Sequence, residues 1–189
     1  MSKFIVVSGP SGVGKGTLIK MLQEKYKELD KKIYLSVSCT TRSPREGEEE
    51  GVAYYFITEE EFLNRVNNGD FLEYNKYGTG KYYGTPKSTA LKYLNDGYDV
   101  ILEIDVNGYK QVKENFPDCI GVFITAPSLD NLRSRLINRG TETMDVIEQR
   151  IETAKEELKS VDLYDKVIIN YEGEVDKAFN EFFDIINED

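Results

Sequence analysis

The chain has 189 residues, of which 40% are apolar and 31% are charged, and its net charge is −10 at pH 7. This length and apolar fraction allow one domain, or one core with an inserted lobe. The acidic balance argues against a general nucleic-acid-binding protein. The sequence contains no histidine, which excludes Ser–His and Cys–His nucleophile schemes and any His-ligated metal site.

The sequence predicts neither a membrane span nor a disulfide framework. It has no run of about 18 apolar residues, and it enters a predicted strand without the pattern of a signal peptide. Cys39 and Cys119 lie in unrelated contexts, so nothing indicates a metal cluster. We therefore expect a cytoplasmic monomer or homodimer with no membrane partner and no nucleic-acid partner.

A glycine-rich segment follows an apolar predicted strand at 4–7 and precedes a predicted helix from 18 to about 29. Gly9, Gly14 and Lys15 have the spacing of a phosphate-binding loop, or P-loop. Glycines let successive N–H groups point into one concavity, and the helix N-terminus adds positive dipole. The alternative is a flexible turn without a ligand. The flanking strand and helix favour an ATP site, with Lys15 reaching the β- and γ-phosphates, formed by Gly9, Pro10, Ser11, Gly12, Val13, Gly14, Lys15, Gly16 and Thr17.

Two residues are candidates for holding Mg²⁺ beside the ATP. The position after the P-loop lysine is normally Ser or Thr, which holds the metal, but here it is Gly16. Thr17 follows and supplies the contact directly or through water. Asp105 ends an apolar predicted strand at 99–105, where an acidic group often orders Mg²⁺ and its waters. Asp105 can equally cap the following helix, and both roles are compatible.

Predicted strands and helices alternate at both ends of the chain, which indicates an α/β core with a parallel sheet flanked by helices. The strands are at 33–38, 99–105, 120–125 and 166–170, and the helices at 106–115, 127–139, 144–160 and 174–187.

Residues 35–98 are different, because their predicted strands are short and rich in Tyr and Phe. Thr58 and Glu61 form a capping box at the start of a helix that runs to about residue 68. Residues 38–48 and 76–85 are predicted to be loops outside the core, and Pro86 is predicted at the first position of a helix ending at Gly97. This segment predicts an inserted small mixed α/β lobe.

The arginines are clustered, although the chain as a whole is acidic. Six of the seven lie in two places, which are Arg42 with Arg45 and then Arg133, Arg135, Arg139 and Arg150. Arginine grips phosphate with two parallel hydrogen bonds. The clustering therefore indicates two phosphate-handling sites besides the loop at Lys15.

Four stretches together resemble the guanylate kinases of the nucleoside-monophosphate kinase superfamily. They are residues 9–17, residues 36–47, residues 82–85 with 101–108, and residues 135–150. The resemblance implies one guanylate kinase-like domain over 1–189, with a P-loop core at about 1–34 and 99–189, a GMP-binding lobe at about 35–98 and a helical lid at about 135–150. Between Glu73 and Tyr83 the chain carries one residue more than the family usually has.

The resemblance implies that the inserted lobe binds GMP. Arg42 and Arg45 would clamp its phosphate together with Tyr54 and Tyr83, unless the two arginines belong to a solvated loop. Because another tyrosine adjoins each of these, either assignment is open by one position.

Guanine presents two adjacent donors, N1–H and the 2-amino group, and an acceptor at O6. An ionised carboxylate only accepts, so it matches the pair of donors. The resemblance assigns this role to Glu73, with Glu103 as a second acceptor and Ser38 and Thr85 as donors to O6. The alternative for Glu73 is an exposed strand residue. Adenine would leave a buried carboxylate unpaired, at a cost of about 1–3 kcal/mol.

The lid arginines complete the implied site. Arg135 and Arg139 are four apart on one predicted helix and Arg150 is on the next, so all three would neutralise the transferred phosphoryl group with Lys15. Arg133 is predicted to be a surface residue, and Asn170 would contact the adenine of ATP. The implied reaction converts ATP and GMP to ADP and GDP with Mg²⁺. The alternatives are a small-molecule kinase with another acceptor and a non-catalytic binding module.

Overall fold

A computed structural model describes residues 2–77, 80–140 and 142–188 of the chain. Its strands are β1 (Phe4–Ser8), β2 (Ile33–Leu35), β3 (Cys39–Thr40), β4 (Tyr55–Phe56), β5 (Phe71–Lys76), β6 (Tyr82–Pro86), β7 (Asp99–Glu103), β8 (Ile120–Thr125) and β9 (Lys166–Ile169). Its helices are α1 (Lys15–Glu28), α2 (Glu59–Asn67), α3 (Lys87–Asn95), α4 (Val106–Asn115), α5 (Leu129–Arg139), α6 (Met144–Leu158), the short 3₁₀ helix η1 (Val161–Leu163) and α7 (Val175–Asn187).

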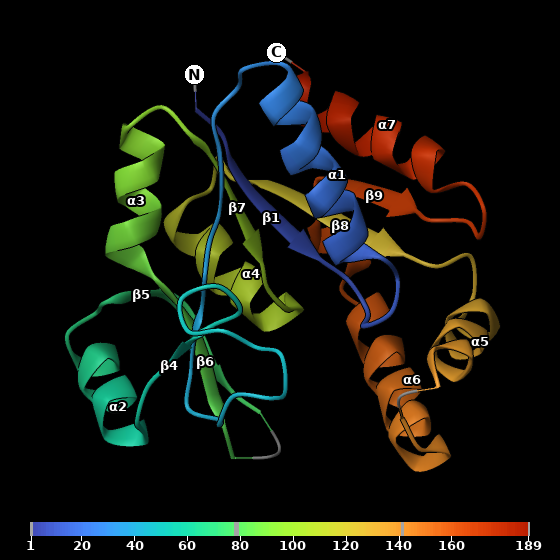
Figure 1. Cartoon of the computed structure of the whole chain (residues 1–189), viewed down its shortest axis with the longest axis horizontal. Helices are drawn as coiled ribbons and strands as arrows, with labels where there is room; N and C mark the ends of the chain where they lie inside the picture. Colours follow the sequence, from blue (N-terminus) through green and yellow to red (C-terminus); the bar gives the residue numbers. More distant parts are fainter. Residues whose placement is uncertain (1, 78–79, 141, 189) are drawn as a thin grey trace. The chain divides into compact units, whose positions relative to one another are not determined.

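The strands form two sheets (Figure 1). One is five-stranded in the order β2-β7-β1-β8-β9, and the other is four-stranded in the order β4-β3-β6-β5. The pairs β2–β7, β1–β8 and β8–β9 are parallel, whereas the smaller sheet mixes parallel and antiparallel pairs. The predicted α/β class, with a parallel sheet and a second, mixed sheet, is therefore confirmed.

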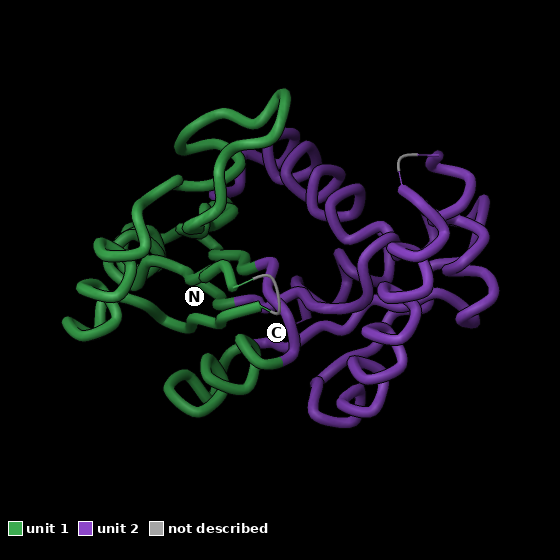
Figure 2. Tube along the Cα trace, turned by 90° about the horizontal axis from the view of Figure 1, so that it is seen from below, with its two compact units in different colours: residues 1–4, 33–102, 107–119 green, residues 5–32, 103–106, 120–189 purple. Residues whose placement is uncertain are grey.

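The chain divides into two compact units (Figure 2). Unit 1 comprises residues 1–4, 33–102 and 107–119, and unit 2 comprises residues 5–32, 103–106 and 120–189. The boundaries that the sequence indicated for core, lobe and lid stay a prediction. The extra residue expected between Glu73 and Tyr83 falls where residues 78–79 lie outside the described chain.

The small sheet of unit 1 uses two segments that the sequence predicted to be loops. Cys39 pairs with Gly84 in antiparallel register and with Tyr55 in parallel register, and Cys39 is fully buried. The prediction of loops at 38–48 and 76–85 is thus wrong for β3 and β6. The reason is tertiary pairing, since a two-residue strand has no periodicity of its own and gains its partners only from the sheet.

Gly84 explains why β6 carries a loop-like composition. A Cβ at this position would stand 3.0 Å from the carbonyl oxygen of Glu73 and 3.0 Å from the rings of Phe62 and Phe71. These two rings stack at 4.5 Å and form a buried cluster with Cys39 in unit 1. Glycine therefore serves close packing here.

The helix starts follow the local capping residues more closely than the short strands follow the sequence pattern. The Oγ1 of Thr58 accepts the N–H of Glu61 at 3.1 Å, which confirms the predicted N-terminus of α2. Ser128 caps α5 in the same way, accepting the N–H of Asn131 at 3.1 Å. Pro86 is the N-cap of α3 and also the last residue of β6, whereas the sequence predicted it at the first position of the helix.

The core of unit 2 lies on its parallel strands. Val7 aligns with Val122, and Phe123 aligns with Val167 on the next strand. The first three of these side chains are fully buried. Helices α1 and α7 lie side by side, with the rings of Tyr26 and Phe183 6.5 Å apart (Figure 1). No helix among the described residues is long and apolar enough to cross a membrane.

Candidate functional site

Residues 9–14 form the loop between the end of β1 and the start of α1. Gly9 and Gly14 have φ angles of +137° and +99°. A Cβ on Gly9 would stand 1.9 Å from the carbonyl oxygen of Ile124, and one on Gly14 would stand 2.6 Å from Nδ2 of Asn170. Both ends of the loop therefore require glycine for conformation and for space.

Lys15 is folded over this loop. Its Nζ donates to the carbonyl oxygen of Gly9 at 2.7 Å and to that of Pro10 at 3.1 Å. Burial lowers the pKa of the Lys15 ammonium, and the nearby charges of Arg139 and Arg150 lower it further, although two carboxylates oppose them. The lysine thus places a partly desolvated positive charge at the loop, which suits a polyphosphate.

Asn170 braces the loop from the end of β9. Its side-chain Nδ2 donates to the carbonyl oxygen of Val13 at 2.8 Å. The backbone carbonyl oxygen of Asn170 accepts from Nη2 of Arg135 at 2.6 Å. The side chain is buried, and within the described part of the chain its Oδ1 has no hydrogen-bond partner. Arg135 and Asn170 therefore both support the loop.

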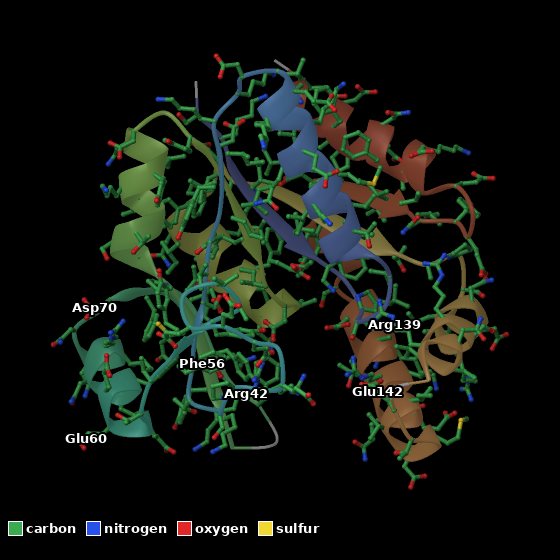
Figure 3. All side chains as sticks on the ribbon, in the orientation of Figure 1. Arg42, Phe56, Glu60, Asp70, Arg139 and Glu142 are labelled. Carbon is green, nitrogen blue, oxygen red and sulfur yellow. The ribbon has the colours of Figure 1, made fainter. Side chains whose placement is uncertain are left out.

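Two further arginines come from α5 and α6. Arg150 donates to Oγ of Ser11 in the loop and pairs with Glu142. Arg139 is the last residue of α5 and is exposed; Figure 3 labels it together with Glu142. The structure thus places Arg150 against the loop, Arg135 against Asn170, and Arg139 where its charge acts on Lys15. Arg133 instead pairs with Glu148 and is half-exposed, as predicted for a surface residue.

Two carboxylates act on Lys15 by their charge. Glu103 and Glu157 both raise the pKa of Lys15 by their charge. Burial raises the pKa of Glu157, and the charge of Asp105 adds to this, while Lys15 opposes it. Like charges held near one another favour a cation or its water shell at this place.

Oxygen ligands of this kind suit Mg²⁺. The described residues contain no group of three or more His, Cys, Asp or Glu side chains that could hold a metal ion alone. Thr17 is exposed in the first turn of α1, and none of the atoms that the structure describes lies within 4 Å of where a Cβ on Gly16 would stand.

In unit 1, Arg42 is the centre of a cluster of polar and aromatic side chains. Its Nη1 and Nη2 donate to Glu48 at 2.6 and 2.7 Å, and its Nε donates to the hydroxyl oxygen of Tyr83 at 3.1 Å. Its guanidinium carbon lies 4.9 Å from the centre of the Tyr54 ring and 5.7 Å from that of Phe56, which Figure 3 labels beside it. The Arg42 side chain is fixed in place and not loosely solvated.

The structure separates the two tyrosine pairs. Tyr54 and Tyr83 face Arg42, with their rings 5.7 Å apart. Tyr55 and Tyr82 pack instead against the buried core that contains Phe62. The geometry therefore favours Tyr54 and Tyr83, the two residues predicted for this cluster. Arg45 is exposed, and its backbone N–H donates to Glu48 at 2.8 Å.

Glu73 is buried at 6% exposure, so the alternative of an exposed strand residue is wrong. Its Oε1 accepts the hydroxyl of Thr85 at 2.6 Å, and the Thr85 oxygen lies 3.3 Å from Oγ of Ser38. The three predicted guanine-binding residues of the lobe thus form one chain of polar atoms. Because the Thr85 proton is directed at Glu73, Ser38 is the donor of the second contact.

The sequence did not reveal which carboxylates act on Lys15 and Arg42. Glu103 belongs to unit 2, where its charge acts on Lys15, and the other predicted GMP residues belong to unit 1. Glu48 was predicted only as the end of the loop at 38–48, yet it holds Arg42. No sequence pattern marks this contact, because it depends on how residues 42–48 curl. No sequence pattern marks Glu157 either, because it is one of several acidic residues on its helix.

A parallel sheet with a glycine-rich loop between β1 and α1, and a lysine folded over that loop, defines an α/β protein of the P-loop class. The chain belongs to the guanylate kinase family, since the family model described as guanylate kinase matches residues 1–189. The resemblance seen in the sequence is thereby confirmed.

Individual relatives agree with the family model. The chain is 43% identical to the guanylate kinase of Prochlorococcus marinus over 98% of its length and 97% of that protein, and 47% identical to the guanylate kinase of Enterococcus faecalis over 96% and 86%. Among solved structures it matches the guanylate kinase of Anaplasma phagocytophilum with a TM-score of 0.76 and 30% identity, covering 98% of this chain and 84% of that one.

Proposed function

We propose that the protein transfers the γ-phosphoryl group of ATP to GMP, giving ADP and GDP. Membership of the guanylate kinase family supports a kinase that acts on GMP. The observation that carries the choice of base is the burial of the Glu73 carboxylate beside Thr85 and Ser38, since an ionised carboxylate only accepts hydrogen bonds and so matches a ligand with two adjacent donors. Guanine supplies two adjacent donors and adenine does not.

The phosphate loop would bind the triphosphate of ATP. Its backbone N–H groups and the N-terminus of α1 suit anionic oxygens, and the Lys15 ammonium would exchange its two loop carbonyls for the β- and γ-phosphates. The remaining loop residues, Ser11, Gly12, Val13 and Gly16, would contribute through the backbone. Asn170 would contact the adenine, while its Nδ2 braces the loop.

The lid arginines would stabilise the charge that develops during transfer. Arg150 can release Ser11, and Arg139 is exposed, so both can turn to phosphate oxygens. Arg135 would act from its place beside the loop. Preformed cations of this kind lower the barrier because the transferred group carries its charge on three equatorial oxygens.

The chemistry needs little from acids or bases. An oxygen of the GMP phosphate attacks the γ-phosphorus of ATP, the new P–O bond forms, and the bond to the β–γ bridging oxygen breaks so that ADP leaves with its electron pair. The attacking oxygen is already ionised at neutral pH, so no general base is required. The absence of histidine from the sequence is consistent with this scheme.

Asp105 would hold Mg²⁺ largely through water, and Thr17 would supply a hydroxyl oxygen. The ion would neutralise charge on the β- and γ-phosphates. The charge of Asp105 acts on Glu157, so both carboxylates would attract a cation.

In the lobe, Arg42 and Arg45 with Tyr54 and Tyr83 would bind the phosphate of GMP. Glu73 would accept from N1–H and the 2-amino group, with Glu103 as a second acceptor. Ser38 and Thr85 would donate to O6, for which Thr85 must turn its proton away from Glu73. We propose that this takes place in the cytoplasm.

Release of ADP, measured with ATP, Mg²⁺ and each of GMP, AMP, CMP and UMP, tests the proposal. We expect turnover with GMP alone. Turnover with another nucleotide would support a small-molecule kinase with another acceptor and overturn the role of Glu73. Binding of GMP without any turnover would support a non-catalytic module.

A further inference from the structure

Glu48 lies between β3 and β4 and has no role in the site proposed above. Its Oε2 accepts from Nη1 of Arg42 at 2.6 Å, and its Oε1 accepts from Nη2 at 2.7 Å. Oε2 also accepts the backbone N–H of Arg45 at 2.8 Å. We propose that Glu48 is a positioning residue that fixes both arginines for the phosphate of GMP. The inference rests on the proposed function.

The first consequence concerns the plane of the Arg42 guanidinium. Glu48 holds one edge with two parallel hydrogen bonds, a geometry that fixes direction as well as distance. Tyr83 accepts from Nε at 3.1 Å, and the rings of Tyr54 and Phe56 lie near the guanidinium carbon at 4.9 and 5.7 Å. Arg42 is therefore ordered before the nucleotide arrives, which lowers the entropy cost of binding.

The second consequence concerns which donors remain for a phosphate. A guanidinium has five N–H donors. Nε uses one on Tyr83, Nη1 uses two on Glu48 and on the carbonyl oxygen of Ser43 at 3.0 Å, and Nη2 uses one on Glu48. Among the described contacts this leaves one Nη2 hydrogen. Because the Tyr83 oxygen accepts from Arg42, the phenolic hydrogen of Tyr83 is also directed to another acceptor.

The third consequence concerns Arg45. Its backbone N–H donates to the Glu48 side chain, and its carbonyl oxygen accepts the N–H of Glu48 at 3.1 Å. Residues 45–48 are thus closed into a turn from both sides. The exposed side chain of Arg45 projects from this turn. By holding the backbone of Arg45, Glu48 therefore sets the direction in which the Arg45 side chain points.

The Arg42–Glu48 pair differs from the solvated ion pairs elsewhere on the chain. Its side chains are only 12% and 21% exposed, whereas Lys159 and Glu156 are 68% and 70% exposed. The side-chain hydrogen bonds from Arg42 lower the pKa of Glu48 to about 2, and the Arg45 backbone adds to this. The carboxylate therefore stays ionised throughout the neutral range.

Glu48→Gln is the decisive variant, because it keeps the size of the side chain and replaces one acceptor oxygen with a donor that faces an arginine donor. We expect the KM for GMP to rise about tenfold. The kcat at saturating GMP and the KM for ATP should stay within about twofold of the parent. Glu46→Gln is the matched control, since Glu46 is exposed in the same loop and the charge change is identical. It should leave all three constants unchanged.

A second readout separates positioning from damage to the lobe. Guanosine carries the base without the phosphate, so its inhibition constant should be the same for the parent and for Glu48→Gln. Equal weakening of guanosine and GMP would overturn the inference, because the defect would then lie in the fold. An unchanged or lowered KM for GMP would also overturn it, and a lowered value would mean that Glu48 competes with the phosphate.

Two more variants complete the design. Glu48→Asp keeps the charge but is too short to span both Nη atoms of Arg42, and we expect it to raise the KM for GMP about threefold. It replaces the Gln variant if that chain does not fold. Arg42→Ala tests the proposed function itself. An unchanged KM for GMP in Arg42→Ala would overturn the phosphate site. If the KM for GMP rises in Arg42→Ala but does not change in Glu48→Gln, only the role of Glu48 is overturned.

Discussion

Replacing Glu73 by Gln changes base recognition without changing the size of the side chain. Glu73 is 6% exposed, and its Oε1 accepts the hydroxyl of Thr85 at 2.6 Å. In the variant the amide oxygen keeps the contact with Thr85, which needs an acceptor. The amide nitrogen then takes the place of the second carboxylate oxygen, and in the proposed complex it would face the donors of guanine.

The size of the effect follows from burial. Loss of one hydrogen bond to a charged acceptor costs about 1.5–3 kcal/mol, and a buried donor left against another donor costs about 1–3 kcal/mol more. Water does not compensate at a position as closed as that of Glu73. We therefore expect kcat/KM for GMP to fall about 10²–10⁴-fold, since each 1.4 kcal/mol is a factor of ten.

Steady-state ADP release at varied GMP and at varied ATP measures this effect. The KM for ATP should not change, and the melting temperature should not fall, because the variant also removes a buried charge. Glu60→Gln is a control in the same lobe, exposed on α2 and labelled in Figure 3. If kcat/KM for GMP in Glu73→Gln stays within about threefold of the parent, Glu73 does not read the base.

Three further variants test unit 2. Gly9→Ala should lose roughly 3 kcal/mol or more of stability, because its Cβ would stand 1.9 Å from the carbonyl oxygen of Ile124; an unchanged urea midpoint would contradict this. Gly16→Ser fits into open space, so the Mg²⁺ concentration that half-saturates thermal protection by ATP should fall severalfold, and no change would mean that Thr17 already suffices. Burial raises the pKa of Glu157 above its unfolded value of 4.5, so its ionisation lowers stability as pH rises through the folded pKa. Glu157→Gln should therefore stabilise the chain more at pH 8 than at pH 5, which melting at both values measures.

Patterns carried by neighbouring residues were predicted well from the sequence. The loop from Gly9 to Lys15 lies between a strand and a helix as expected, because the glycine spacing and its flanks are local. The cap at Thr58 is confirmed for the same reason. Both features depend on residues within one turn of each other, where backbone preferences decide the outcome.

Features that arise from long-range pairing were missed. Cys39 and Thr40 are fully buried in β3 although their segment looks polar, because β4 and β6 pair with them. The orientation of Tyr54 and Tyr83 toward Arg42 also follows from this sheet. A sequence can name such residues, but their facing direction depends on a register that is set by partners tens of residues away.

The phosphate loop shows how binding residues also hold the fold. Gly9 lies against Ile124 of β8, and Asn170 at the end of β9 holds the carbonyl oxygen of Val13. Arg135 of α5 in turn donates to Asn170. Because these contacts close a chain from α5 to the loop, removal of Arg135 changes loop geometry as well as charge, and the kinetics of that variant mix the two. Arg139 makes no described contact with the loop backbone, so its removal isolates the charge and gives the cleaner test of the stabilisation of phosphoryl transfer that we propose for these arginines.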